Sequence, residues 1–318
     1  MANKLLVAPS PHVHSSESTS RIMRDVVIAL LPALVVSVIY FGVSALVVTA
    51  VSILSCVLFE YLIQKFLIKG ECTICNYSAI ITGILLGFNL PASLPLWIVV
   101  MGALVAIGVA KMTYGGLGKN PFNPALVGRV FLLIAYPAQM TLFPAVDGFS
   151  GATPLAAVKS GAMALSDVNL QNMLIGSIPG SLGEVSAICL ILGGVYLLWR
   201  KVISWHIPVA VLGTMVVMAA ANAILGDGGA TIYLSPLFHI LAGGALLGSI
   251  YMATDYSTSP MTHKGMLIYG VGIGFITMWI RLNGAYPEGM SFAILIMNAC
   301  VPLINKYIKP KRFGLIKK

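Results

Sequence analysis

The stretch of this sequence best suited to carry chemistry is a polar segment that ends in a threonine. It reads Asp147-Gly148-Phe149-Ser150-Gly151-Ala152-Thr153. The hydroxyl of Thr153 follows small residues, so we expect it to be exposed and sterically open. Gly148 and Gly151 would let the active site of another protein approach the backbone closely, and Asp147 would place a metal ion or steady the turn. Asp-Gly and Ser-Gly pairs are also typical of an ordinary turn, so residue types alone leave both interpretations open.

Ionisable residues at the apolar runs form a second group of candidates. Glu60 lies near the end of one run, and Asp255 follows another. A charge at the centre of a membrane costs about 2.5–3.5 kcal/mol on insertion scales, so such residues are functional candidates by default. The alternative is that Glu60 pairs with a nearby lysine at the membrane surface, while Arg129 and Arg281 extend their charged ends towards water.

Amide and thiol side chains add weaker signals. Four asparagines are expected at breaks between apolar runs, where amides bind ions or a flavin ring or, more simply, cap helix ends: Asn89, Asn120, Asn123 and Asn298. The Cys72-Thr73-Ile74-Cys75 segment has the spacing of a metal-binding pair. Structural zinc normally needs four ligands, and the sequence offers no second pair, so we expect no metal site.

The composition determines what kind of scaffold must position these residues. Of the 318 residues, 58% are hydrophobic and 9% are charged, and the mean hydropathy is +0.94. Soluble domains have about 25% charged residues, so this chain is expected to be an integral membrane protein in contact with the lipid bilayer. The net charge of +9 comes from cations that stand singly or in pairs between apolar runs, with one cluster of six at the C-terminal end. This pattern provides no continuous basic face for nucleic acid.

The apolar runs predict an all-α membrane fold with ten crossings in two sets of five. The runs cover 26–40, 44–63, 79–90, 94–110 and 124–138, then 182–199, 208–225, 237–252, 266–280 and 291–308. The run 79–90 is shorter than the roughly 20 residues that a span needs, which predicts a broken helix. Residues 82–87 and 243–248 resemble each other, and five is odd, so we expect two inverted repeats with binding sites near the broken helices.

These runs divide the chain into five parts. They are a polar lead (1–21), a first five-helix repeat (22–138), a loop (139–181), a second, inverted five-helix repeat (182–308) and a basic tail (309–318). With both ends in the cytoplasm, 17 of the 19 Lys and Arg residues fall on the cytoplasmic side, Arg129 included, and only Lys159 and Arg281 fall outside. The positive-inside rule therefore predicts cytoplasmic termini and a loop with Thr153 on the non-cytoplasmic side of the membrane.

Over essentially its whole length, the sequence resembles the NqrB/RnfD family. These proteins are membrane components of the sodium-pumping NADH:quinone reductase (NqrB) and of the Rnf ion-translocating ferredoxin:NAD oxidoreductase (RnfD), and the resemblance is to the Rnf type. The segments that carry it are Ser10-Pro11-His12, Gly118-Lys119-Asn120-Pro121-Phe122-Asn123-Pro124-Ala125, Ser150-Gly151-Ala152-Thr153, Tyr251-Met252-Ala253-Thr254-Asp255 and Tyr286-Pro287-Glu288-Gly289-Met290-Ser291-Phe292-Ala293.

The resemblance implies a covalent flavin. In this family a flavin transferase, using FAD and a divalent metal ion, esterifies the matching threonine to FMN through its phosphate. It recognises an acidic-Gly-x-Ser/Thr-Gly-Ala-Thr pattern, which the sequence matches at Asp147, Gly148, Ser150, Gly151, Ala152 and Thr153. The quinone-reductase relatives also hold riboflavin, so a second, non-covalent flavin is implied, although no motif locates it.

The resemblance also implies a place in a complex of a bacterial or archaeal cell membrane. The chain would relay electrons among the other Rnf subunits (A, B, C, E and G) while Na⁺ or H⁺ crosses the membrane, with Glu60 and Asp255 as candidates on the ion path. The family fold is similar to that of urea and ammonium channels. Two other functions remain compatible with the sequence: a non-redox channel or transporter, and a passive scaffold that anchors partner proteins.

Overall fold

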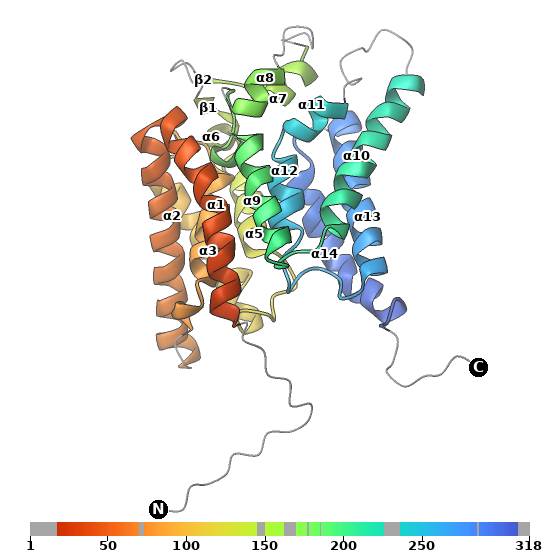
Figure 1. Cartoon of the computed structure of the whole chain (residues 1–318). Coiled ribbons are helices and arrows are strands. Elements are labelled where there is room, and N and C mark those ends of the chain that lie inside the picture. The colour runs from red at the N-terminus through yellow and green to blue at the C-terminus, as the bar shows by residue number, and fades with distance from the viewer. Residues whose placement is uncertain are drawn as a thin grey trace, which may run out of the picture.

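The computed structural model of the chain describes residues 18–69, 73–144, 150–161, 170–176, 178–184, 186–225, 236–284 and 286–310. Long helices stand side by side, and their connections gather at two opposite faces (Figure 1). We call the face where α1 (Thr19–Phe41) begins and α14 (Met290–Tyr307) ends the terminal face. The opposite face, which carries β1, β2, α7 and α8, is the loop face.

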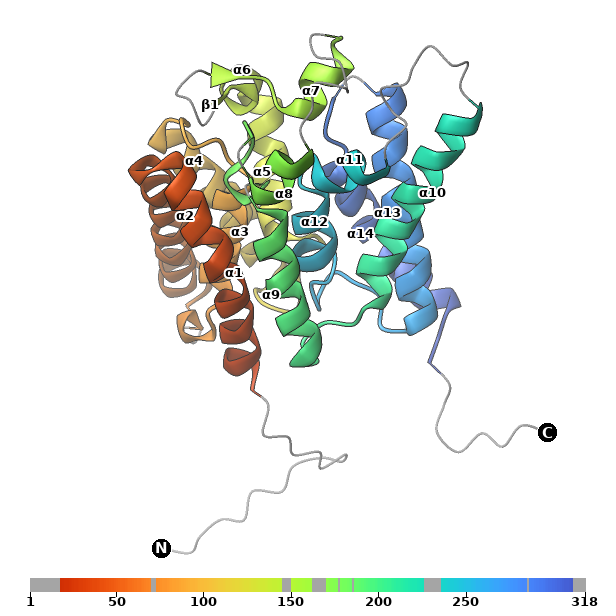
Figure 2. The same ribbon diagram turned by 45° about the horizontal axis from the view of Figure 1, so that its top comes forward.

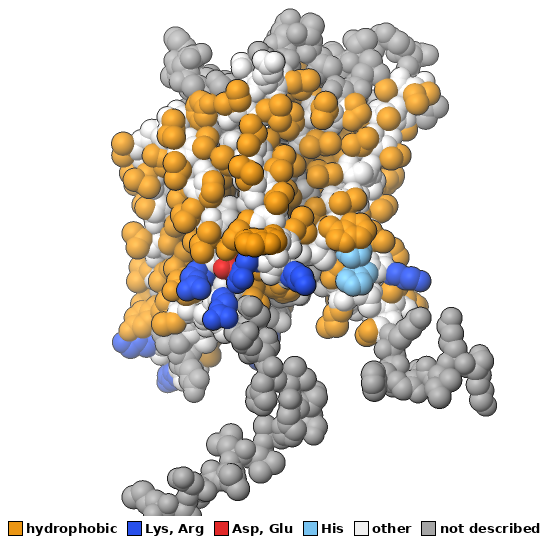
Figure 3. Space-filling model, in the orientation of Figure 1, with side chains coloured by type: hydrophobic (Ala, Val, Ile, Leu, Met, Phe, Trp, Pro, Cys, Tyr) orange, Lys and Arg blue, Asp and Glu red, His pale blue; other side chains and the backbone are white. Residues whose placement is uncertain are grey.

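Six helices in the described part of the chain are long and apolar enough to cross a membrane, so the chain is a multi-pass membrane protein. They are Thr19–Phe41, Val43–Ile68, Leu96–Tyr114, His206–Ile224, His263–Asn283 and Met290–Tyr307. Three shorter apolar helices lie among them: α3 (Ser78–Phe88), α5 (Pro124–Ala135) and α9 (Ala187–Trp199). On the side of the bundle shown in Figure 3, the exposed side chains are mostly hydrophobic, whereas Lys and Arg gather at the rim of the terminal face.

Two of the spans combine an α-helix with a short π-helix or 3₁₀-helix. The second consists of α2 (Val43–Leu62) and the π-helix η1 (Ile63–Ile68), and the third of α4 (Leu96–Leu104), the π-helix η3 (Val105–Val109) and the 3₁₀-helix η4 (Met112–Tyr114). Helices α10 (His206–Leu225) and α13 (His263–Asn283) are continuous. The 3₁₀-helix η2 (Ile74–Asn76) precedes α3, and another, η6 (Leu182–Glu184), precedes α9.

Short elements make up the described part of the loop face. They are α6 (Pro137–Thr141), the antiparallel pair β1 (Phe143–Pro144) and β2 (Ser150–Gly151), α7 (Pro154–Lys159) and α8 (Leu170–Ile175). In the tilted view, α6 and α7 lie over the ends of the long helices, and α8 is close to α11 (Figure 2). Leu155, Val158, Met173, Ile178, Phe238 and Ala242 form a small hydrophobic cluster there, separate from the main core.

The apolar run 237–252 is not a single helix, because it is broken into α11 (Pro236–Leu241), α12 (Ala245–Leu247) and the π-helix η8 (Gly248–Met252). Gly243 and Gly244 adopt φ of +65° and +63° at the break, a backbone conformation that glycine reaches without a steric penalty. The run 124–138 is also divided, since Pro137 begins α6 after α5 has ended at Ala135. The run 79–90 is a short helix, as its length predicts.

The first and second halves of the chain are in direct contact. Helix α1 packs against α9, and the hydroxyl of Tyr251 donates to the carbonyls of Ala29 and Leu190. A Cβ added to Gly193 would collide with that hydroxyl and with the Ala29 carbonyl oxygen. Only glycine allows this approach, which is typical of closely packed membrane helices.

Candidate functional site

A cavity at the loop face brings together residues from both halves of the chain. Its volume, including the open space at its mouth, is about 500 Å³. The lining side chains come from the end of α3, from α5, α6, β1 and α7, and from the connection between α13 and α14: Asn89, Arg129, Leu133, Met140, Thr141, Phe143, Thr153, Ala156, Tyr286, Pro287 and Glu288. We call this the loop-face cavity.

Thr153 lies in the wall of this cavity as the N-cap of α7. Its Oγ1 accepts a hydrogen bond from the Ala156 amide at 3.3 Å, and Pro154 occupies the first helical position, both of which are common at helix starts. The expectation of an exposed hydroxyl is wrong, because Thr153 is only 3% exposed. Helix capping and the docking of α7 bury the side chain against the cavity.

The residues before Thr153 are positioned by the β1–β2 pair. Gly151 pairs with Phe143, and Ser150 pairs with Pro144. Ala152 is exposed, and a Cβ placed on Gly151 would have no atom within 4 Å. The packing of this chain therefore does not demand glycine at 151. Asp147 and Gly148 lie outside the described residues.

Arg129 provides the positive charge of the loop-face cavity. Its Nη1 donates to Asn89 Oδ1 and to Ser291 Oγ, each at 2.8 Å, and its Nη2 forms an ion pair with Glu288. The side chains of Arg129 and Glu288 are 8% and 13% exposed. The interpretation of Arg129 as a residue that reaches for water at the terminal face is therefore wrong, because its guanidinium is bonded inside the protein beside the loop-face cavity.

A second buried guanidinium stabilises the helix break at Gly243. Arg281 is fully buried; its Nη1 donates to the His239 carbonyl at 2.5 Å, and its Nη2 donates to the carbonyls of Ala242 (2.8 Å) and Gly243 (3.2 Å). The α11–α12 break leaves these carbonyls free of helical partners, so Arg281 satisfies them and does not extend towards water. A Cβ on Gly243 would lie 2.8 Å from Nη2.

Sequence reasoning missed Glu184, which lies beside this break. It is 7% exposed, and its Oε1 has no hydrogen-bond partner among the residues that the structure describes. That oxygen would lie 3.4 Å from a Cβ placed on Gly244. A carboxylate at the start of an apolar run looks like an interfacial residue in the sequence, and only the position of η6 beside the break shows that it is buried.

Glu60 forms the expected ion pair, but with a partner and a depth that the sequence did not predict. Its Oε2 lies 2.5 Å from Lys111 Nζ, and the two side chains are 1% and 2% exposed. Lys111 also donates to Ser78 Oγ at 2.8 Å. The pair is therefore buried between α2 and the end of the α4–η3 span, and is not a contact at the membrane surface.

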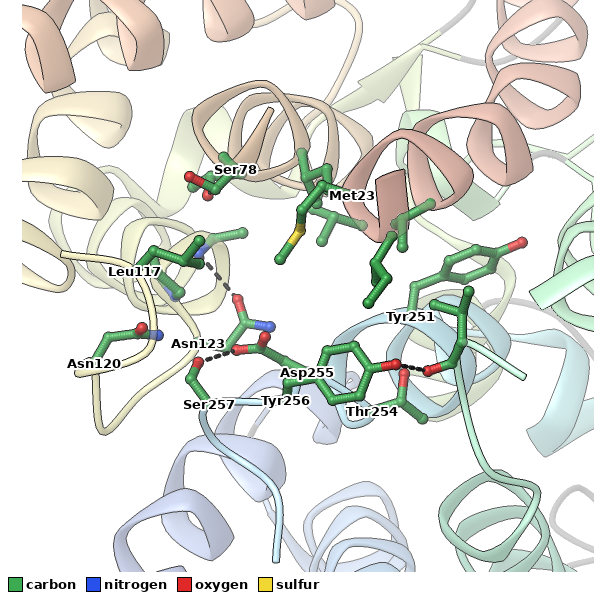
Figure 4. A pocket seen from close by; sticks show the side chains of 18 of the residues that line it. Met23, Ser78, Leu117, Asn120, Asn123, Tyr251, Thr254, Asp255, Tyr256 and Ser257 are labelled. Carbon is green, nitrogen blue, oxygen red and sulfur yellow. Dashed lines mark hydrogen bonds between the residues drawn. The ribbon is translucent and has the colours of Figure 1, made fainter. Parts of the chain in front are cut away.

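Asp255 lines a second, larger cavity at the terminal face, with a volume of about 760 Å³ (Figure 4). Its Oδ2 accepts hydrogen bonds from the hydroxyls of Ser257 (3.0 Å) and Thr258 (3.2 Å). Burial raises the pKa of Asp255, and these hydroxyls and Lys111 oppose the rise. Lys111 and Ser78 also line this terminal-face cavity, so the structure brings the Glu60 pair and Asp255 to one region.

The asparagines are divided between capping and packing. Asn123 caps α5 by accepting from the Ala125 amide at 3.1 Å, and its Nδ2 donates to the Met252 carbonyl. Asn120 Nδ2 donates to the Phe122 carbonyl, and both asparagines line the terminal-face cavity. Asn89 lies at the expected break after α3, but Asn298 is inside α14, 2.6 Å from the Tyr269 hydroxyl, so a break there is wrong.

The structure describes one of the two cysteines of the Cys72–Cys75 segment. Cys75 is exposed, and Cys72 lies outside the described residues. Within the described part of the chain, no three His, Cys, Asp or Glu side chains come together in a way that could hold a metal ion.

Comparison with known proteins identifies the family. The sequence model of the NQR2, RnfD, RnfE family matches residues 6–314. The chain is 43% identical to the D component of the Na(+)-translocating ferredoxin:NAD(+) oxidoreductase complex of Acetobacterium woodii, over 98% of this chain and 96% of that protein. The chain belongs to the NQR2, RnfD, RnfE family.

Two further proteins similar to this chain have names that record the translocated ion differently: one names the proton, and the other names no particular ion. The chain is 42% identical to the D component of the proton-translocating ferredoxin:NAD(+) oxidoreductase complex of Clostridium ljungdahlii, over 98% of this chain and 97% of that protein. It is 34% identical to the D component of the ion-translocating oxidoreductase complex of Mannheimia succiniciproducens, over 97% of both. These relatives are parts of redox-driven translocases, and both Na⁺ and H⁺ occur among them.

Proposed function

We propose that this chain is the RnfD-type membrane subunit of an ion-translocating ferredoxin:NAD oxidoreductase complex and that it carries FMN esterified to Thr153. Full-length similarity to such subunits supports the first part. The observation that carries the second is the position of Thr153: the last residue of the flavinylation motif lines a cavity that also contains a guanidinium.

The residues of the loop-face cavity fit a flavin phosphate. Arg129 offers a guanidinium that a phosphate would share with its ion-pair partner Glu288, and the rings of Phe143 and Tyr286 offer flat surfaces for an isoalloxazine. When bound, FMN would supply one- and two-electron redox chemistry, while the protein supplies position and electrostatics. The α7 cap orients the Thr153 oxygen into the cavity wall, and the docked loop elements limit the access of water to it.

We assign riboflavin, as the second and non-covalent flavin, to the terminal-face cavity. Its volume of about 760 Å³ exceeds that of the loop-face cavity. Asn120, Asn123 and Thr254 offer donors and acceptors for the polar edge of a flavin ring, and the aliphatic side chains of α1 and α3 offer an apolar wall.

The proposed topology has ten crossings in two inverted repeats, with both termini in the cytoplasm, in a fold similar to that of urea and ammonium channels. Equivalent contacts support the repeat: α2 packs against α3 and α4 as α10 packs against η8 and α13, and α4 packs against α5 as α13 packs against α14. The Lys and Arg side chains at the rim of the terminal face support cytoplasmic termini. The loop-face cavity would then open on the non-cytoplasmic side.

The ion path would involve Glu60 and Asp255. Lys111 connects them, because it is paired with Glu60 and lines the cavity that holds Asp255. The other Rnf subunits (A, B, C, E and G) would supply ferredoxin and NAD chemistry, and a flavin transferase would attach FMN.

The flavin is tested by Thr153→Val, expressed with the transferase and viewed under ultraviolet light after denaturing electrophoresis. We expect a fluorescent wild-type band and a dark variant band. Thr141→Val is the matched control, because Thr141 lines the same cavity and its hydroxyl donates to the carbonyls of Pro137 and Ala138 in its own helix. A dark wild-type band would exclude the covalent flavin and favour a channel or a scaffold.

The ion path is tested in the assembled complex in membrane vesicles. Glu60→Gln and Asp255→Asn are expected to lower ion uptake per electron transferred, while ferredoxin-dependent NAD reduction continues in part. Unchanged ion uptake and electron transfer in both variants would favour a scaffold role.

A further inference from the structure

The segment from Thr153 to Lys159 is held at the loop face by two independent sets of contacts. The first is apolar. Leu155 and Val158 are one helical turn apart on α7 and are 1% and 2% exposed. They pack in the small cluster with Met173 of α8 and Phe238 of α11. Because this cluster is separate from the main core, its opening leaves the long helices intact.

The second contact is a single lysine. Lys159, the last residue of α7, directs its Nζ at the end of α13 and donates to three carbonyls: Gly284, Tyr286 (3.0 Å) and Ile280 (3.3 Å). The C-terminal end of a helix carries the negative end of the helix dipole. Ile280 is in the last turn of α13 and its carbonyl also accepts from the Gly284 amide at 2.8 Å, Gly284 is the C-cap, and Tyr286 lies in the connection that follows. A cation with three donors reaches all three carbonyls, so Lys159 ties α7 to the C-terminal end of α13.

The docked position conceals the group that the proposed modification needs. Attachment of FMN from FAD requires the Thr153 oxygen to attack the flavin-side phosphorus. The pyrophosphate P–O bond then breaks, AMP leaves, and the hydroxyl proton passes to a base of the transferase. In the structure this oxygen accepts from the Ala156 amide, and Thr153 is 3% exposed. A second protein cannot bring a phosphorus atom to an oxygen that is covered in this way.

We propose that Lys159 is the positioning residue that docks the Thr153 segment, and that the hydroxyl becomes available for modification only when α7 leaves its docked position at the loop face. This inference rests on the proposed flavin at Thr153. Docking then orders the modified segment over the loop-face cavity. Loosening the Lys159 contact is expected to have two effects. The flavin is attached faster, and the amides of the segment are less protected from hydrogen exchange.

The test uses the full chain, purified without flavin and then incubated with the transferase, FAD and Mg²⁺. Initial rates come from the fluorescence of denatured bands, and amide hydrogen exchange of peptides covering 150–161 measures docking without any flavin. Lys159→Met keeps the length of the side chain and removes its donors. A hydrogen bond to a charged group is worth about a factor of ten or more in an equilibrium, so we expect roughly tenfold faster exchange and a several-fold higher rate of attachment.

Three further variants separate docking from general damage. Lys159→Arg retains a cation with donors, so its rate of hydrogen exchange and its rate of flavin attachment are expected to lie close to those of the wild type. Leu155→Ala loosens the same segment through its apolar contact and is expected to act in the same direction as Lys159→Met. Lys264→Met, an exposed lysine at the opposite face, is expected to change neither.

Unchanged exchange in Lys159→Met would overturn the docking role. Faster exchange with an unchanged or lower rate of attachment would overturn the requirement for undocking. A wild-type chain that takes up no flavin, together with faster exchange in Lys159→Met, would overturn the flavin at Thr153 and support the docking role of Lys159.

Discussion

The two cavities of this protein handle buried charge in opposite ways. At the loop face, Arg129 is held by Asn89, Ser291 and the carboxylate of Glu288, so its charge is paired and its orientation is fixed. At the terminal face, Asp255 is held by two neutral hydroxyls of its own loop. The nearby Lys111 is paired with Glu60 instead.

This difference indicates what each cavity suits. A guanidinium that is bonded on several sides keeps one orientation, which suits the positioning of an anionic group. A buried carboxyl with neutral partners is easier to protonate, which suits the passage of a proton or cation. The proposed flavin at the loop face and the proposed ion path at the terminal face follow this division.

The largest expected effect comes from removing the fixed charge of the loop-face cavity. Arg129→Met leaves Glu288 without its cation and Asn89 without its donor, and loss of one partner of a buried pair costs about 3–5 kcal/mol. Thermal unfolding of the detergent-solubilised chain measures this loss of stability. The double variant Arg129→Met/Glu288→Gln is expected to lose less stability than Arg129→Met alone. An equal or greater loss of stability would show that the ion pair with Glu288 is not the main contribution of Arg129.

Lys111→Met is the corresponding change near the terminal-face cavity. It leaves Glu60 buried and unpaired, with an expected loss of about 3 kcal/mol, and Lys111→Met/Glu60→Gln is expected to recover part of that loss. Covalent flavin yield separates the two regions. The yield should fall in Arg129→Met and stay near wild type in Lys111→Met. A similar yield in both variants would contradict the proposal that the covalent flavin depends on the loop-face cavity and not on the terminal-face cavity.

A smaller effect is expected at the helix break beside the loop-face cavity. Gly243→Ala places a Cβ at a positive φ and within 2.8 Å of Arg281 Nη2, which costs on the order of 2 kcal/mol. Gly213→Ala is the matched control in α10, where nothing lies within 4 Å of the added carbon, and a gain of about 0.5–1 kcal/mol is expected there. The thermal unfolding midpoints of the two variants are compared with that of the wild type. Equal shifts of the midpoint would mean that the helix break does not depend on glycine at position 243.

The smallest effect is expected at Asp255 and depends on pH. Burial raises the folded-state pKa of Asp255, so the folded protein binds this proton more tightly than the unfolded chain does. Its contribution to stability is complete below the unfolded pKa and is lost as pH rises through the folded pKa. Asp255→Asn is therefore expected to raise Tm relative to wild type above that range, by on the order of 2–4 °C for each unit of pKa shift. A Tm difference that is constant from pH 4 to 9 would contradict the raised pKa.

Much of the secondary structure could be predicted from the sequence, because membrane helices are recognisable by apolar composition alone. The spans 26–40, 44–63, 266–280 and 291–308 agree with long helices to within a few residues at most ends. The run 237–252 did not, because hydropathy cannot distinguish a continuous apolar helix from one that two glycines interrupt. The Thr153 motif was visible in the sequence, whereas its burial was not.

By itself, the sequence determined that this chain lies in a membrane, that it belongs with one family, and that Thr153 ends a recognisable motif. These are local or compositional properties, and they survive without any knowledge of packing. Tertiary structure decided which charges meet. Arg129 and Glu288 are far apart in the chain, as are Glu60 and Lys111, and a buried ion has to find its partner wherever the fold places one. The same packing buried Thr153 and directed Lys159 onto the end of α13, because a short helix is positioned by its contacts with the surrounding elements and not by its own sequence.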